Sequence, residues 1–208
     1  MKSVLMSIKP EWCVLIASGK KTFELRKSFP HLENLNVPFK VYIYQTKPKE
    51  RLLEVMKEGD TLYGETYHGK PAFIKTTESI YPLHGTYGRW QKVIGEFVCD
   101  YANNVYPTGL IVGDDRLTVD GNDDMPIDKY CMTEEQVRAY IGEKKGVGWH
   151  ISDLVIYDQP KKLTEFHAPC DSKCDGMCYE GVGCCRVITR PPQSWCYVDE
   201  MLLVGGRR

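Results

Sequence analysis

The sequence lacks both a long apolar run that could span a membrane and an N-terminal export signal. No stretch approaches the roughly 18 uninterrupted apolar residues of a membrane helix. The opening residues, MKSVLMSIKPEW, are interrupted by Lys9 and Pro10 and carry no small-residue cleavage site, so they do not predict export. We therefore expect a cytoplasmic protein with no membrane partner.

An excess of charge of one sign is also missing. The 208 residues hold 27 Lys and Arg against 28 Asp and Glu, which gives a formal net charge of −1. Proteins that coat nucleic acid through its phosphates usually show a strong basic excess. Any nucleic-acid role of this chain should therefore depend on a local pocket and not on a broad electrostatic field.

No calcium loop, internal repeat or low-complexity tract is present. The acidic stretch DGNDDM resembles the start of a calcium loop, but its glycine stands at the wrong position. Cys131 also occupies the twelfth position, where such a loop needs a glutamate that binds with both oxygens. The sequence therefore excludes this kind of calcium site.

The elements that the sequence does contain are short strands with few helices. A helix is predicted from Pro10, with Trp12, Leu15 and Ile16 on one face and an end at Gly19. Further helices are predicted at 49–58 and between the capping pair Thr133/Gln136 and Gly142. Strands are predicted at 2–8, 22–29, 39–46, 92–101, 148–157 and 195–204. This pattern favours an α+β, mainly β fold: a small β-barrel of about five to six strands with peripheral short helices.

A chain of this length forms one generous domain, and we expect residues 1–208 to be that domain. Two segments interrupt the strand pattern and are predicted to be insertions. Residues of about 50–90 include a part rich in Gly, Tyr, His and Thr that predicts loops or hairpins, and 103–131 is an acidic excursion. A Cys-rich loop follows at 167–186.

The segment GKKTFELR, residues 19–26, combines charge with strand alternation. Phe23 and Leu25 should enter the core, while Thr22, Glu24 and Arg26 should share the opposite face. On a tightly curved barrel, that face is expected to be a cleft. The alternative is a solvated strand whose charges form a surface ion pair worth about 0–1 kcal/mol.

The side chains of this face suit a nucleotide. Glu24 can accept hydrogen bonds from a base edge, and Arg26 can bind phosphate or stack on a base. Lys21 supplies a point charge, or a general base if burial lowers its pKa. Lys9 and Lys47 at strand ends, and Trp149 and Trp195 as stacking rings, are further candidates. For these four, the alternatives are ordinary surface lysines and core tryptophans.

Six of the nine cysteines fall between Cys170 and Cys196, and in a reducing compartment such a cluster suggests metal before disulfides. Four thiolates, or three with His167, can enclose a tetrahedral structural zinc ion. An iron–sulfur cluster is the rival, since it also takes four thiolates. A reduced loop without metal is the third interpretation. The candidate ligands are Cys170, Cys174, Cys178, Cys184 and Cys185.

With these residues placed, the N-terminal third resembles the ASCH family of the PUA-like superfamily. The family's signature of glycine, any residue, lysine, two of any, glutamate, any, arginine matches Gly19, Lys21, Glu24 and Arg26. The segments LMSIKPEWCVLIASGKK, VYIYQTKP and VIGEFVCDY resemble its opening strand, helix and next strands. GVGWHISDLVIYDQPKKLTEF and RPPQSWCYV resemble the C-terminal half of phage- and prophage-type members.

The resemblance implies a small barrel whose cleft binds RNA or modified nucleotides. Some small members are similar to amidohydrolases acting on N4-acetylcytidine. Those enzymes use a threonine nucleophile two positions after the residue that matches Thr22, and this chain has Glu24 there. A carboxylate cannot replace a hydroxyl in forming an acyl-enzyme by the same path.

Three functions follow from the sequence. The first is a binding module for RNA or a modified nucleotide that uses Lys21, Glu24 and Arg26. The second is a hydrolase of an acylated nucleoside or of RNA, with Lys21 and Glu24 as acid and base. The third is an interaction protein that uses the acidic excursion and the metal-binding loop. Whether the chain is an enzyme is left open by the sequence.

Overall fold

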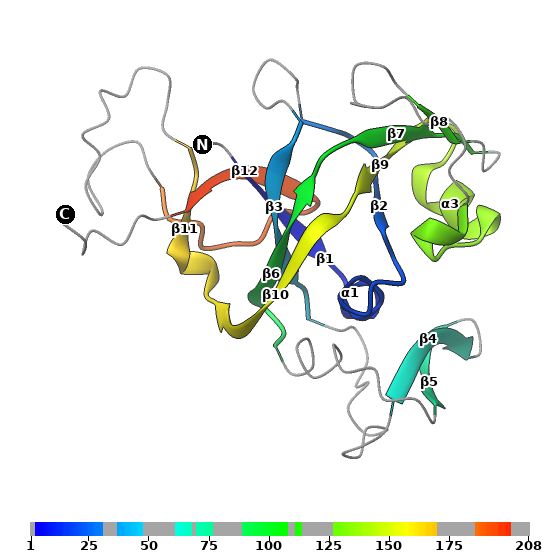
Figure 1. Cartoon of the computed structure of the whole chain (residues 1–208), viewed down its shortest axis with the longest axis horizontal. Helices are drawn as coiled ribbons and strands as arrows, with labels where there is room; N and C mark the ends of the chain where they lie inside the picture. Colours follow the sequence, from blue (N-terminus) through cyan, green and yellow to red (C-terminus); the bar gives the residue numbers. More distant parts are fainter. Residues whose placement is uncertain are drawn as a thin grey trace.

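The described part of the chain is mainly β-structure with two α-helices (Figure 1). The computed structural model describes residues 3–30, 37–47, 61–67, 70–76, 89–107, 111–113, 127–169 and 186–200. The helices are α1 (Pro10–Ala17) and α3 (Glu134–Ile141), with short 3₁₀ turns at η2 (Ile127–Tyr130) and η3 (Leu163–Glu165). The strands are β1 (Ser3–Ile8), β2 (Phe23–Arg26), β3 (Phe39–Gln45), β4 (Thr61–Tyr67), β5 (Lys70–Thr76), β6 (Lys92–Cys99), β7 (Ala102–Val105), β8 (Ile111–Gly113), β9 (Gly146–His150), β10 (Ser152–Lys161), β11 (Phe166–His167) and β12 (Trp195–Glu200).

The strands form three sheets. The largest has the order β10-β6-β3-β1-β12-β11, the second β2-β9-β7-β8, and β4 pairs only with β5. All pairs are antiparallel except β1 with β3, which run parallel because α1 and β2 lie between them in the chain. The mainly β class is confirmed. The predicted barrel of about five to six strands is wrong for the described residues, which form twelve strands in sheets that do not close into a barrel. Their sheets remain open, with β10 and β11 at the edges of one and β2 and β8 at the edges of the other.

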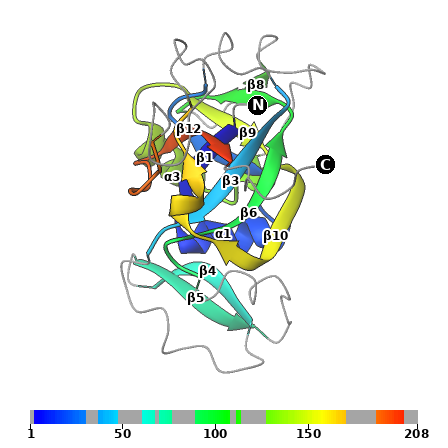
Figure 2. The same cartoon turned by 90° about the vertical axis from the view of Figure 1, so that its left-hand side faces the viewer.

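Two long bent ribbons connect the larger sheets (Figures 1 and 2). β6 continues into β7 after two residues, and β9 continues into β10 after Ile151 alone. The His150 amide donates to the carbonyl of Tyr101 (3.1 Å), so the pairing is carried across the bend. The predicted strand at 92–101 is found as β6, and the one predicted at 148–157 is divided between β9 and β10 in two sheets, whereas β7 was not predicted.

Close contact between β6 and β10 requires a glycine. A Cβ atom on Gly95 would lie 2.3 Å from the carbonyl oxygen of Val155 in β10. Backbone cannot yield as the end of a flexible side chain can, so any larger residue would push the two strands apart. Gly95 therefore allows β10 to pair with β6 as the edge strand of the six-stranded sheet.

Three hydrophobic clusters fill the spaces between the layers. The first lies between the two larger sheets and α1 and includes Val4, Met6, Phe97 and Trp149. The second covers the other face of the six-stranded sheet, where Leu163 and Phe166 pack on it. The third lies under α3. β2 borders both the first and the third cluster, which determines the environment of its charged residues.

The two described helices agree with their predicted signals. Pro10 begins α1, and Gly19 follows it with φ of 73°, a left-handed conformation that glycine adopts without strain. Thr133 and Gln136 form the predicted capping box of α3, and Gly142 ends it. No helix in the described ranges is long and apolar enough to cross a membrane.

The predicted insertions are described only in part. Strands β4 and β5 confirm a hairpin within residues 60–90, and both views show it beside α1 and away from the larger sheets (Figures 1 and 2). The helix predicted at 49–58 lies outside the described residues, as do most of the acidic excursion and cysteines 170–185. The single domain and its insertion boundaries remain predictions.

Candidate functional site: a buried charge cluster on β2

The charged face of β2 is buried. Phe23 and Leu25 enter the hydrophobic cluster under α3, as the alternation predicts. Glu24 and Arg26 are only 5% and 6% exposed, and Lys21, just before the strand, is 2% exposed. The alternative of a solvated surface ion pair is therefore wrong. We call Lys21, Glu24 and Arg26 the buried charge cluster.

Glu24 lies between the two cations. Its Oε1 is 2.9 Å from Nη2 of Arg26, and its Oε2 is 3.5 Å from Nζ of Lys21. With all three groups ionised, the cluster carries one net positive charge. Charges this well buried interact strongly because water screens them little.

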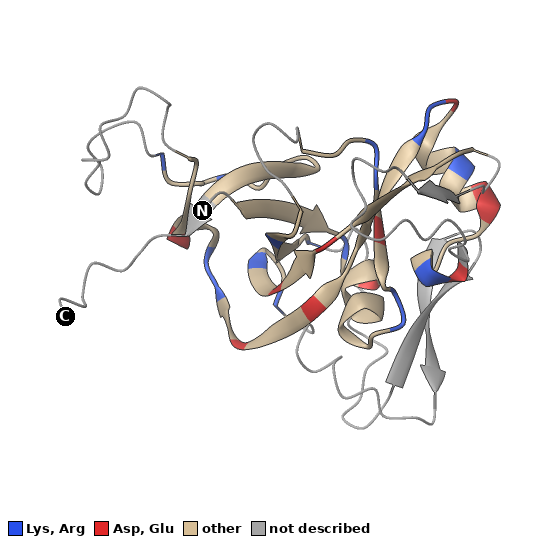
Figure 3. Ribbon diagram, turned by 45° about the horizontal axis from the view of Figure 1, so that its top comes forward, with Lys and Arg blue, Asp and Glu red and all other residues tan. Residues whose placement is uncertain are grey.

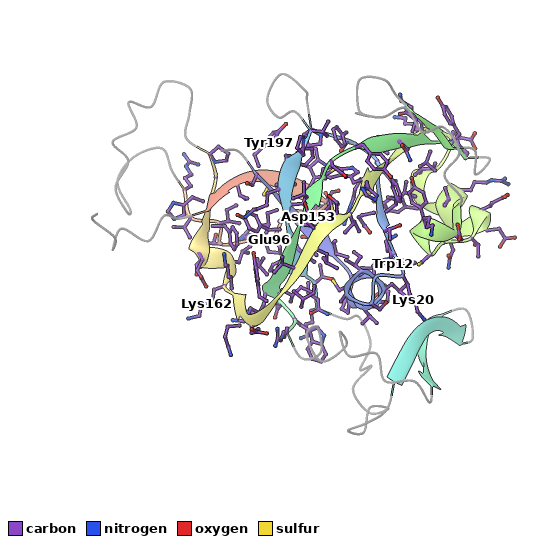
Figure 4. All side chains as sticks on the ribbon, in the orientation of Figure 1. Trp12, Lys20, Glu96, Asp153, Lys162 and Tyr197 are labelled. Atoms are coloured by element: carbon purple, nitrogen blue, oxygen red, sulfur yellow. The ribbon has the colours of Figure 1, made fainter. Side chains whose placement is uncertain are left out.

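Backbone carbonyls hold both cations in place. Lys21 donates from Nζ to the carbonyl oxygen of Tyr130 (2.7 Å), and Arg26 donates from Nη2 to that of Ser7 (2.8 Å). The Lys21 ammonium also lies 5.0 Å from the centre of the Trp12 ring, at cation–π distance. Figure 4 shows Trp12 on α1, near the start of β2.

Two polar atoms of the cluster have no hydrogen-bond partner among the described residues. They are Oε2 of Glu24, an acceptor, and Nε of Arg26, a donor. Buried polar atoms are normally paired, because each unpaired one costs about 1–3 kcal/mol. We call these two atoms open because neither makes a hydrogen bond among the described residues, although Oε2 of Glu24 stays at ion-pair distance from Nζ of Lys21 (3.5 Å).

Burial lowers the pKa of Lys21 from its ordinary value, and the Glu24 carboxylate partly opposes this shift. A lowered pKa raises the neutral fraction of the amine, which a general base requires. Burial also raises the pKa of Tyr140, whose hydroxyl lies near Arg26 and Glu24. Tyr140 therefore keeps its proton at neutral pH and can donate it in a hydrogen bond.

Half-buried side chains separate the cluster from solvent. Trp12 lies over Lys21, Cys131 is close enough to Lys21 for the two to affect each other's pKa, and Tyr140 adjoins Arg26. Thr22 is also half-buried, and its backbone bonds to Lys129 and Ile151 fix the start of β2.

The remaining predicted ligand-binding residues lie elsewhere. Lys9 is exposed, and its Nζ lies 3.9 Å from Oε1 of Glu11. Lys47 is also exposed and lies at the same end of the parallel β1–β3 pair as Lys9. Trp149 is fully buried, so in this conformation its ring offers no stacking surface. Trp195 is half-buried, and the centre of its ring lies 5.8 Å from that of Trp149. Its indole Nε1 donates a hydrogen bond to Oγ of Ser28.

The residues whose carbonyls accept hydrogen bonds from the cluster were not predicted from the sequence. Ser7 and Tyr130 act through backbone carbonyls, which any residue type supplies, so the sequence carries no signal for them. Tyr130 is also 109 positions from Lys21 in the chain. The position of Trp12 on the first helix was predicted, but its contact with Lys21 was not.

No group of three or more His, Cys, Asp or Glu residues within the described ranges is placed to hold a metal ion. The five cysteines proposed as ligands lie outside those ranges. His167 lies inside them, on β11, and its buried Nε2 has no hydrogen-bond partner among the described residues. The zinc site therefore stays a prediction.

Charged residues are interspersed over the described elements and do not gather by sign along any one of them (Figure 3). This distribution agrees with the net charge of −1. The buried charge cluster, and not a basic surface, is the distinctive electrostatic feature of the described residues.

Comparison with known proteins gives solved structures only. No family model and no curated protein matches the chain. An ASCH protein from Zymomonas mobilis is similar at 17% identity, with 94% of this chain and 86% of that chain covered and a TM-score of 0.45. A serine-to-alanine variant of that protein is 17% identical, with 94% of this chain and 87% of that chain covered and a TM-score of 0.48. A tyrosine-to-phenylalanine variant is 18% identical, with 78% of this chain and 77% of that chain covered and a TM-score of 0.44. These values are too low to decide the family or the function of this chain.

Proposed function

We propose that this protein is a binding module for RNA or a modified nucleotide and that the buried charge cluster recognises the base. The observation that carries the proposal is the pair of open polar atoms, Oε2 of Glu24 and Nε of Arg26. A nucleobase edge places hydrogen-bond donors and acceptors side by side, and so can pair with an open acceptor and an open donor.

A purely structural role explains the cluster poorly. Buried ion pairs are often replaced by apolar residues of similar volume with no loss of stability, because desolvation offsets their attraction. Here three charges are buried beside a large apolar cluster, and two of their polar atoms are open. Buried polar atoms without hydrogen bonds need an explanation, and a ligand that completes the bonding is the one we propose here.

The charge balance supports a local mode of recognition. Nucleic-acid binding through phosphates alone needs many surface cations, and the chain has no basic excess. The single net positive charge of the cluster favours an electron-rich base edge or one phosphate group. We therefore propose that a splayed-out base or a single nucleotide enters the site, as is usual for sequence-specific RNA recognition.

Equilibrium binding of short RNAs and of a panel of modified nucleosides tests the proposal. The wild-type protein should retain a ligand, and Glu24→Gln should weaken binding at least tenfold, because the open carboxylate oxygen is lost. Glu143→Gln makes the same change at an exposed position after α3 and should bind as the wild type does. Equal affinity of the two variants, both folded, would exclude the cluster as the binding site.

A hydrolase is the second candidate, and the lowered pKa of Lys21 favours it. In this function Lys21 and Glu24 act as acid and base on an acylated nucleoside, such as N4-acetylcytidine, or on RNA. Because the threonine nucleophile of the related amidohydrolases is absent, the attacking group would be water. Mass spectrometry distinguishes the two functions: a new product that depends on Lys21 makes the protein an enzyme, whereas retained but unchanged ligand makes it a binding module.

We also keep the proposal that the Cys-rich segment holds a structural zinc ion and that the protein works in a reducing cytoplasm. Thiolates of the segment, with or without His167, would supply the ligands. The zinc would join parts of a loop that is too polar to pack by itself. No step of the proposed recognition passes through this metal.

A further inference from the structure

We propose that Tyr130 is the positioning residue of the buried charge cluster, and that its ring, seated over Gly148, holds the carbonyl group that orients Lys21. This inference rests on the proposed function, because the ammonium that Tyr130 orients belongs to the proposed ligand-binding site. Nothing in the sequence indicates this role, since Tyr130 lies far from Lys21 in the chain and contributes a backbone atom to it.

Two bonds join the end of η2 to the start of β2. The carbonyl of Lys129 accepts from the Thr22 amide (3.1 Å), and that of the next residue, Tyr130, accepts from the Lys21 ammonium (2.7 Å). The first bond sets the distance between the two segments. The second is a charge-assisted bond from a side chain that is 2% exposed, so it restrains the ammonium where water competes little.

The side chain of Tyr130 fixes where its carbonyl points. The ring is fully buried, and its centre lies 5.2 Å from that of Phe23. It lies directly over Gly148 in β9: a Cβ there would be 1.8 Å from the Tyr130 hydroxyl oxygen and 2.6 Å from ring carbons. The absence of a side chain at Gly148 is therefore the condition for this position of the tyrosine.

The chain that follows Tyr130 is fixed as well. Cys131 has φ of 52°, and its amide donates to the carbonyl of Asp128 (2.9 Å), which closes the turn before α3. The Tyr130 carbonyl is thus restrained by its own ring and by the turn after it. A restrained acceptor holds the Lys21 ammonium between Glu24 and the Trp12 ring.

The contact also affects the charge of Lys21. The ionisable groups that face it are Glu24 and Arg26 from β2 and Cys131 from the turn after η2. Burial and Arg26 lower its pKa, while Glu24 and Cys131 raise it. A carbonyl that accepts a bond from the ammonium favours the protonated form. Loss of this acceptor in a site that stays buried should therefore lower the pKa further.

Gly148→Ala tests the inference, with Gly95→Ala as the matched control. Both substitutions add one Cβ against a close neighbour in a strand, but the added atom meets the Tyr130 ring in one case and the Val155 carbonyl in the other. The titration of Lys21 is followed by NMR of lysine labelled at Cε, with Lys21→Arg to assign the signal. We expect the midpoint of the Lys21 titration to fall by about one pH unit in Gly148→Ala. In Gly95→Ala it should stay within about 0.2 pH units of the wild-type value.

An unchanged midpoint in folded Gly148→Ala, a rise, or an equal fall in both variants would overturn the inference. If Gly148→Ala does not fold, Tyr130→Leu replaces it and Tyr130→Phe becomes the control, since phenylalanine keeps the ring over Gly148. The midpoint should then fall in Tyr130→Leu and remain in Tyr130→Phe, and equal midpoints in these two would overturn the inference.

Ligand binding is measured on the same variants with the RNAs and nucleosides described above. If the wild-type protein binds none of them, the proposed function fails, while the titration still decides whether Tyr130 positions Lys21. If the wild type binds and the Lys21 midpoint falls in Gly148→Ala, affinity should fall at least fivefold there. Unchanged affinity with a shifted midpoint would overturn the functional part of the inference.

Discussion

Lys21, Glu24 and Arg26 show why charge in a strand does not by itself mean exposure. Each lies on a segment that borders apolar side chains on both sides, and each is less than one-tenth exposed. Mutual pairing and two backbone carbonyls offset the cost of burying these groups. The arrangement is stable only while every charge keeps its partner.

Replacing Glu24 with glutamine should reveal this dependence. The substitution removes the anion and leaves two buried cations without a counter-charge, a change that typically costs about 3–5 kcal/mol. Urea unfolding of Glu24→Gln should show this loss, whereas Glu143→Gln at its exposed position should stay within about 0.5 kcal/mol of the wild type. A loss below about 1 kcal/mol in Glu24→Gln would contradict the buried, paired geometry.

Lys21 should also make stability depend on pH. Its pKa is lower in the folded protein than in the unfolded chain, so between the two values the unfolded state binds more protons. The contribution of Lys21 to stability should therefore rise with pH through this window, which ends near the ordinary value of 10.5. Below the folded pKa the contribution is constant.

The difference in unfolding free energy between the wild type and Lys21→Met isolates this effect, because other titrating groups are common to both proteins. We expect the difference to move in favour of the wild type as pH rises toward 10.5. A difference that stays constant, or that moves against the wild type, would show that the amine is not desolvated.

At the scale of elements, the sequence predicted what depends on local patterns. The first helix followed from Pro10 and Gly19, and the second from the capping pair Thr133 and Gln136. The alternation in β2 correctly separated Phe23 and Leu25 from the charged residues. Local patterns could not show that both faces of this strand are covered, because α3 comes from a distant part of the chain and the packing of the neighbouring β1 and α1 is a tertiary contact.

The capping box of α3 makes a separate prediction. The Thr133 hydroxyl accepts from the Gln136 amide, and the Gln136 side chain accepts from the Thr133 amide. Thr133→Ala should lower the unfolding free energy by roughly 0.5–2 kcal/mol, while Thr133→Ser should retain most of it. Equal loss in both variants, measured by urea unfolding, would assign the effect to something other than the cap.

At the scale of the whole molecule, the mainly β class was predictable and the closed barrel was not. Apolar alternation located several of the strands but not the short ones, and closure depends on which edges meet. The bends between β6 and β7 and at Ile151 move these ribbons from one sheet to the other, and neither bend carries a proline or glycine that marks it in the sequence. The candidate site was predicted only in part. The sequence indicated its charged side chains Lys21, Glu24 and Arg26, but not the backbone carbonyls of Ser7 and Tyr130 that accept their hydrogen bonds.

The Cys-rich segment gives a prediction for the intact protein. Metal analysis of protein purified under reducing conditions should find about one zinc ion per chain, as a four-thiolate or three-thiolate and histidine site requires. Replacing Cys174 and Cys178 with serine should abolish it, whereas Cys99→Ser, which changes a buried isolated cysteine, should leave the zinc content unchanged. Iron in place of zinc would favour the rival cluster, and the absence of stoichiometric metal would contradict both.

Recognition of a nucleobase by the buried charge cluster predicts a specific binding result. The most direct measurement incubates the protein with short RNAs and modified nucleosides, including N4-acetylcytidine, and follows retained ligand and new product by mass spectrometry. We predict ligand retained unchanged by the wild type and by Glu143→Gln, and lost from folded Glu24→Gln. Neither ligand nor product with any of the proteins, or ligand retained equally by Glu24→Gln, would contradict the claim.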